Sequence, residues 1–168
     1  MTYQSHFDLT DDIINHIDTV IHEISDPFIS SRYIGFISVS AVTVYELAIK
    51  EIFRNFANEE HEILGSFVSS YFERINGQIK LTKIREDYIP RFGQRYKDDF
   101  KVKIEKSELE YLKTSGRSIK NSYHNIIQWR NQFAHEGCIP PTATYQEAIE
   151  SYFAGKEVIH CLSETMHH

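Results

Sequence analysis

The sequence predicts an all-α protein, an up-and-down helical bundle of about five to six helices. Apolar residues recur at spacings of three and four along most of the chain, as one buried face of a helix requires. Two Ser/Thr-x-x-Glu capping patterns occur, and glycine or proline follows several of the periodic stretches. With 168 residues, 41% of them apolar, the chain has enough for one substantial core, so we expect a single domain over residues 1–168.

The first half of the chain contains three expected helices. Asp8–Ile24 carries isoleucine and valine at helical spacing, and an Asp-Pro pair ends it. Phe28–Asn58 is apolar nearly all round; its β-branched residues favour strands individually, but its length and periodicity favour a central buried helix. Glu59–Ile75 repeats the amphipathic pattern and ends at an Asn-Gly pair.

The second half is predicted to hold the remaining helices. Lys80–Lys106 is basic and contains a proline and a glycine, which indicates helical pieces joined by a loop. A capping pattern at Ser107–Glu110 predicts the start of a short helix that a glycine ends. Arg117–Glu136 forms the next amphipathic helix, and a second capping pattern at Thr144–Glu147 opens a helix that runs toward the C-terminus.

The densest group of reactive side chains lies in W-R-N-Q-F-A-H-E-G, residues 129–137. Arg130 falls among the apolar residues of its helix, where a guanidinium needs a carboxylate, a phosphate or a subunit interface to offset its burial. Glu46 in the central helix is the candidate partner. A polar stripe of four side chains occupies the opposite face, at His124, Gln128, Asn131 and His135. That stripe is expected to face solvent, a second subunit or a ligand.

Arg130 and His135 are five positions apart, roughly 140° around an ideal helix, so their side chains do not converge on one atom of a straight helix. Two arrangements would bring them together. Gly137 and the prolines after it place His135 in the last turn, where fraying or a bend would redirect it. Pairing of two copies of the chain would instead pool two arginines and two histidines in one cleft.

The R-N-x-x-x-H arrangement of Arg130, Asn131 and His135 resembles the R-x4-6-H signature of the HEPN superfamily, the higher eukaryotes and prokaryotes nucleotide-binding domains. The central V-Y-E-L-A-I-K helix, the motif helix and the following P-P-T-x-T-Y-x-E-A-I helix make the chain most similar to the RiboL-PSP-HEPN family of predicted ribonucleases. The resemblance covers most of the chain. It implies a metal-independent endoribonuclease that needs no cofactor and acts as a symmetric homodimer, with the two motifs facing each other.

The residue types suit that chemistry. RNA cleavage without a metal needs a group with a near-neutral pKa to move protons and a cation to stabilise charge on the phosphate. We therefore expect His135 to act as acid/base and Arg130 as phosphate clamp, and Asn131 to orient the imidazole or donate to a phosphate oxygen. The alternative is structural, since buried arginines often pair with glutamate, and a histidine near a helix C-terminus is favourable through the helix dipole.

Charge is distributed unevenly. A formal net charge of −6 argues against a protein that coats nucleic acid through bulk electrostatics. Within the basic segment, aromatic residues alternate with cations that could hold an RNA backbone, and the candidate RNA-binding residues are Arg91, Arg95, Lys97 and Lys101. Acidic residues dilute this segment, so an ordinary solvated face is the competing interpretation.

The cysteines, the other histidines and the apolar stretches limit the metals and the location that can be expected. Cys138 and Cys161 are too few for a disulfide framework or a four-ligand zinc site, and the other histidines lack metal-ligand spacing, so we expect no metal and a reducing cytoplasm. No secretory leader is visible, and charges interrupt the most apolar stretch, Tyr33–Ala57, so we expect no membrane span.

The sequence leaves three functional hypotheses. The leading one is an RNA-cutting toxin or defence and stress effector, with RNA as substrate and an antitoxin or regulatory protein as partner. The second is a catalytically silent HEPN module that binds nucleotide or RNA or scaffolds a partner. The third is a toxin controlled by nucleotidylation of a tyrosine just past the histidine, but Gly137 departs from that pattern.

Overall fold

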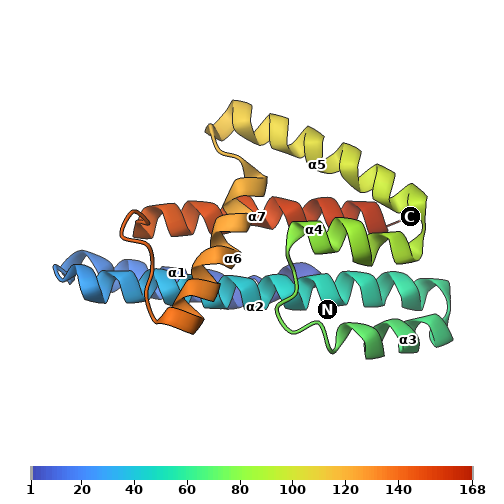
Figure 1. The fold of residues 1–168 in the computed structure, drawn as a ribbon, viewed down its shortest axis with the longest axis horizontal. Helices are drawn as coiled ribbons and strands as arrows, with labels where there is room; N and C mark the ends of the chain where they lie inside the picture. Colours follow the sequence, from blue (N-terminus) through green and yellow to red (C-terminus); the bar gives the residue numbers. More distant parts are fainter. Residues whose placement is uncertain (1, 168) are drawn as a thin grey trace.

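The computed structural model describes residues 2–167, and every regular element in that part of the chain is helical (Figure 1). The seven α-helices are α1 (Asp8–Val20), α2 (Pro27–Glu60), α3 (Glu62–Phe72), α4 (Leu81–Lys83), α5 (Gln94–Ser115), α6 (Ile119–Glu136) and α7 (Tyr145–Met166). Short turns add η1 (Tyr3–His6), η2 (Ile21–Glu23), η3 (Ile84–Tyr88) and η4 (Ile89–Phe92). The all-α prediction is confirmed, and the helix count exceeds the expected five to six because α4 is a single turn.

The long helix α2 is the axis of the bundle. Asp26 caps its start by accepting a hydrogen bond of 2.9 Å from the Phe28 backbone N–H, and Pro27 occupies the first turn, where its missing N–H costs nothing. With 34 residues α2 extends over roughly 50 Å. Helices α1, α3, α6 and α7 all pack against it. In Figure 1, α1 and α3 run beside α2, whereas α6 crosses α2 and α7 steeply.

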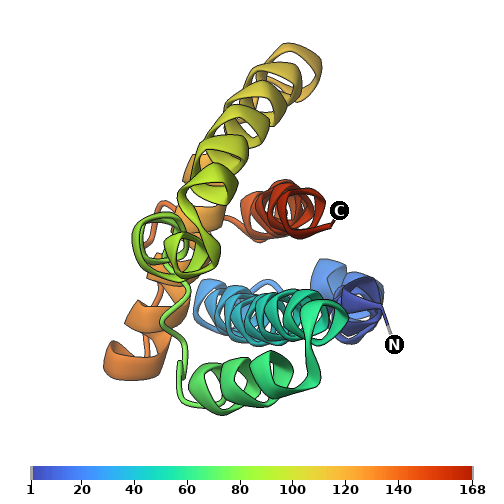
Figure 2. The same ribbon diagram turned by 90° about the vertical axis from the view of Figure 1, so that its right-hand side faces the viewer.

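Helices α5, α6 and α7 form the other side of the molecule. Figure 2 shows α5 leaning outward from the bundle, with its far end well away from α2. Ser118 caps α6 and Thr144 caps α7 through hydrogen bonds to the N–H groups of Asn121 and Glu147, so the second capping pattern is confirmed. Gly137 ends α6 in a left-handed conformation, with φ +66°.

The first capping pattern was interpreted wrongly. Ser107–Glu110 lies inside α5, which runs without a break from Gln94 to Ser115. The carboxylate of Glu108 is buried and accepts a hydrogen bond of 3.2 Å from the backbone N–H of Lys120, in the first turn of α6. Glu108, between the two residues of the pattern, therefore supports the start of a different helix, which local spacing does not reveal.

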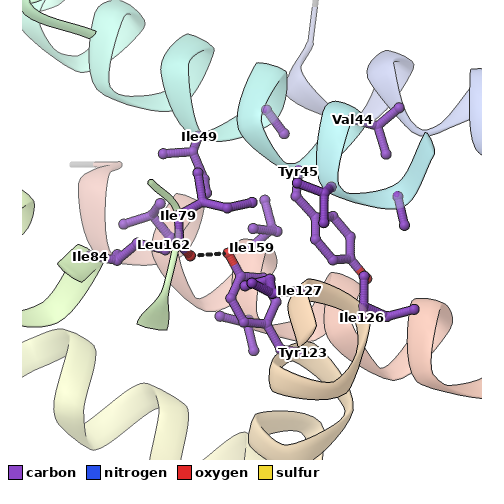
Figure 3. Packing of buried hydrophobic residues seen from close by; sticks show 14 of the residues in the cluster. Val44, Tyr45, Ile49, Ile79, Ile84, Tyr123, Ile126, Ile127, Ile159 and Leu162 are labelled. Atoms are coloured by element: carbon purple, nitrogen blue, oxygen red, sulfur yellow. Dashed lines mark hydrogen bonds between the residues drawn. The ribbon is translucent and has the colours of Figure 1, made fainter. Parts of the chain in front are cut away.

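Three stacked tyrosines hold α2, α6 and α7 together. The ring of Tyr45 lies 5.3 Å from that of Tyr123 and 5.9 Å from that of Tyr152. Tyr45 donates a hydrogen bond to the carbonyl of Tyr152, and Tyr123 donates to the carbonyl of Ile79, drawn as a dashed line in Figure 3. Burial raises the pKa of Tyr45 and of Tyr123 well above its ordinary value, so both remain neutral donors. The first half of α6 is thereby anchored in the core.

Among residues 2–167, no helix combines the length and the apolar character that crossing a membrane requires.

Candidate active site

The motif lies on the second half of α6, which stays helical through Glu136. Trp129 is buried, Arg130 and Asn131 are half-buried, and His135 is exposed. The expected bend or fraying that would turn His135 toward Arg130 is therefore not present. The same last turn also exposes Ala134, because this end of α6 extends beyond the core.

A tight turn after α3 lies against the guanidinium of Arg130. The turn residues Asn76 and Gly77 have positive φ values of 38° and 78°. A Cβ atom at Gly77 would lie 3.0 Å from Nη2 of Arg130. Because a side chain at position 77 would be strained and would crowd the guanidinium, glycine suits both the turn and the arginine.

Asn131 supports Arg130 directly. Its side-chain oxygen accepts a hydrogen bond of 2.9 Å from Nη1 of Arg130. The expectation that Asn131 orients the imidazole of His135 therefore changes, since its oxygen is already engaged by the arginine. The second expected role, donation to a phosphate oxygen, would fall to its amide N–H groups.

Glu46 is not the ion-pair partner of Arg130. Its carboxylate pairs with Lys50 at 2.6 Å and accepts a hydrogen bond from the backbone N–H of Gly77. Among the described residues, Arg130 has no carboxylate partner. Glu46 thus supports the turn that lies against Arg130, and it does not contact the guanidinium that the sequence had paired with it.

Most of the polar stripe on α6 lies on the surface of the chain, where solvent, a second subunit or a ligand can reach it. His124, Gln128 and His135 are exposed and Asn131 is half-buried. No cluster of three or more His, Cys, Asp or Glu side chains suited to a metal ion occurs within residues 2–167.

Arg32 is a second arginine beside the motif, and sequence analysis missed it. Its Nη1 donates a hydrogen bond to the carbonyl of Gly137, and its guanidinium lies 4.4 Å from the ring centre of Phe28. It joins the end of α6 to the start of α2 across more than one hundred residues of sequence, and no local pattern signals that contact.

Comparison with known families identifies the chain. The model of the RiboL-PSP-HEPN family matches residues 5–168, nearly the whole length of the chain. The chain belongs to the RiboL-PSP-HEPN family. No curated protein and no solved structure matches it.

An exposed apolar strip runs along α2 of this RiboL-PSP-HEPN chain, beside the motif helix. It consists of Ile29, Phe36, Val39 and Leu47, which are 44%, 55%, 38% and 39% exposed. Their spacings put them on one face of α2. Phe36 also contacts Phe133 of α6, with ring centres 5.9 Å apart. The strip therefore borders the end of α6 that carries His135.

The candidate RNA-binding residues of this HEPN chain separate into two groups. Arg91 and Arg95 line a cavity of about 720 Å³ between α3, η4 and α5. Lys97 instead pairs with Glu86, and Lys101 is exposed on α5 outside the cavity. The tertiary structure thus brings together two of the four residues that the sequence grouped.

Proposed function

We propose that this protein is a metal-independent endoribonuclease of the HEPN type that acts as a homodimer in the cytoplasm. One observation carries the proposal. The motif guanidinium, Arg130, lies against the Gly77 turn and binds Asn131, and it makes no ion pair with any carboxylate of residues 2–167. Because such a half-buried cation is costly unless an anion meets it, its arrangement fits a phosphate ligand.

The chemistry assigned to the site needs only side chains. His135 removes the proton from a ribose 2′-hydroxyl, whose oxygen attacks the adjacent phosphorus. The bond from phosphorus to the 5′-oxygen breaks, and the leaving oxygen takes the proton from the imidazolium that His135 has become. The products are a 2′,3′-cyclic phosphate and a 5′-hydroxyl end. Arg130 stabilises the negative charge that develops on the phosphoryl oxygens, and Asn131 keeps the guanidinium in place.

A second copy of the chain completes the site. On the straight helix α6, Arg130 and His135 point roughly 140° apart. A twofold axis beside α6 would set the histidine of one protomer against the arginine of its partner. The apolar strip on α2 supports this arrangement, because contiguous apolar surface next to a functional motif is typical of an interface.

Mixing two inactive variants tests the shared site. Arg130→Ala and His135→Ala should each lose at least about 10²-fold in cleavage of total or transfer RNA in EDTA, measured against wild type. When the two are mixed and allowed to exchange subunits, each heterodimer contains one intact combination of His135 and Arg130. We expect about a quarter of wild-type activity, since half the dimers carry one good site of two.

Recovery would not occur if each protomer held its own complete site, and that outcome would refute the shared arrangement. If wild-type protein binds RNA and never cuts it, the catalytically silent module is the correct reading. The finer proposal of a toxin or defence effector, opposed by an antitoxin, rests on the family alone. Growth arrest on induced expression of wild type, absent with His135→Ala, is its test.

A further inference from the structure

A large cavity lies at the C-terminal end of α2, between α3, η4 and α5. The cavity of about 720 Å³ has walls formed largely by aromatic rings, with Phe56, Tyr71, Phe72, Phe92 and Tyr96 among its lining residues. Its volume falls in the range of cavities that hold small organic groups. Phe67 stands at its edge with 73% of its surface exposed, which is unusual for a phenylalanine without a partner.

Two guanidinium groups lie over these rings. Arg91 is 4.6 Å from the ring centre of Tyr71, and Arg95 is 4.5 Å from that of Tyr96. Arg91 uses Nε and Nη2 to bind one oxygen of Asp87, and Arg95 uses Nη2 to bind the hydroxyl of Tyr96. Each arginine has five N–H donors, so both retain donors for an anion at the cavity.

The cavity continues into a neighbouring hollow of about 440 Å³. Phe67 and Tyr71 line both spaces, and Arg74 and Lys83 line only the second. The two hollows therefore make one groove with exposed aromatic faces in the middle and basic side chains along its length. Glu60 also lines the first hollow, and Asp87 pairs with both Lys83 and Arg91, so four cations outnumber two carboxylates along the groove of a chain whose net charge is −6.

We propose that this aromatic groove, defined by the lining residues of both hollows, binds an unpaired segment of single-stranded RNA. Bases would stack on Phe67 and Tyr71, and phosphates would contact Arg74, Arg91 and Arg95. Alternating aromatic faces and cations are what binding of single-stranded nucleic acid requires, and a groove longer than one cavity suits a polymer. The inference rests on the proposed function in taking RNA as the ligand.

The groove leads to the motif at the turn after α3. Ile75 and Gln78 line the second hollow, and Gly77 between them lies against the guanidinium of Arg130. A strand in the groove would therefore run toward Arg130, and the first hollow would hold the part of the substrate farther from the scissile phosphate. Because Phe67 and Arg95 would contact only that part, changes at these two residues should raise KM for RNA and leave kcat nearly unchanged.

Binding of an uncleavable RNA tests the proposal apart from catalysis. A fluorescent single-stranded oligonucleotide with 2′-O-methyl riboses cannot form the cyclic phosphate, so its anisotropy reports binding alone. Phe67→Ala should weaken its affinity about 5- to 150-fold, the loss expected for one stacked base. Ile63→Ala is the matched control: Ile63 is also on α3 and is 74% exposed, but it does not line the groove.

Two substitutions of basic residues provide the second part of the test. Arg95→Ala should lower the slope of log affinity against log salt by about 0.7, the value for one phosphate contact with a single strand. Lys101→Ala, in the same basic segment but outside the groove, should leave the slope unchanged. Equal affinity of wild type, Phe67→Ala and Ile63→Ala would overturn the inference, and so would binding of AMP at Phe67 without binding of the oligonucleotide.

The two proposals fail in different ways. If the wild type cleaves RNA and Phe67→Ala does not change KM, the ribonuclease proposal is supported and the RNA-binding groove is refuted. If the protein binds the oligonucleotide tightly through Phe67 but cuts no RNA, the RNA-binding groove is supported and the ribonuclease proposal is refuted.

Discussion

Replacement of Gly77 by alanine separates the effect of the turn on stability from its effect on Arg130. At φ +78° an alanine pays the cost of the left-handed conformation, about 1 to 2 kcal/mol in the free energy of unfolding. For a chain of this length that lowers Tm by roughly 2 to 8 °C. The new Cβ would also lie 3.0 Å from Nη2 of Arg130, so the guanidinium must move by a few tenths of an ångström.

Gly116→Ala is the matched control. Gly116 ends α5 at φ +70°, and a Cβ added there meets no atom within 4 Å. Both variants should therefore lose similar stability in thermal unfolding. Because a misplacement of 1 Å in a catalytic group costs about 10²-fold, the smaller shift of Arg130 should slow RNA cleavage about tenfold in Gly77→Ala alone. Equal cleavage by the two variants, each fully folded at the assay temperature, would refute the role of the turn in holding Arg130.

Two further predictions concern the surroundings of the motif. Glu46→Ala should lower the free energy of unfolding by about 1.5 to 3 kcal/mol, the range for a hydrogen bond to a charged group, whereas Lys50→Ala should lower it by less than about 1 kcal/mol. Thermal unfolding of both variants measures these losses. A loss of about 3 to 5 kcal/mol for Glu46→Ala would indicate a buried ion pair instead. Phe36→Arg should convert the dimer to a monomer and abolish cleavage, while Val102→Arg on α5, another exposed apolar position, should do neither. Light scattering at micromolar concentration measures the mass, and a wild-type monomer that cuts RNA contradicts the shared site.

Local sequence determined the helices, most of their ends and the motif. Helical periodicity identified α2 and α6, and Gly137 and Thr144 mark an end and a start where the sequence placed them. These features depend on residues within one or two turns of each other, so a single sequence contains the necessary information. The grouping of Arg130, Asn131 and His135 could be predicted for the same reason.

The tertiary structure alone decided which groups meet the motif. Glu46 binds Gly77 instead of Arg130, and Arg32 reaches Gly137 from the other end of the sequence. Glu108, inside the stretch in which the sequence suggested a helix start, likewise accepts a hydrogen bond from Lys120 at the start of α6. Each of these contacts joins segments far apart in the chain, and the choice among competing polar partners depends on where packing places their backbones, which local propensity does not specify.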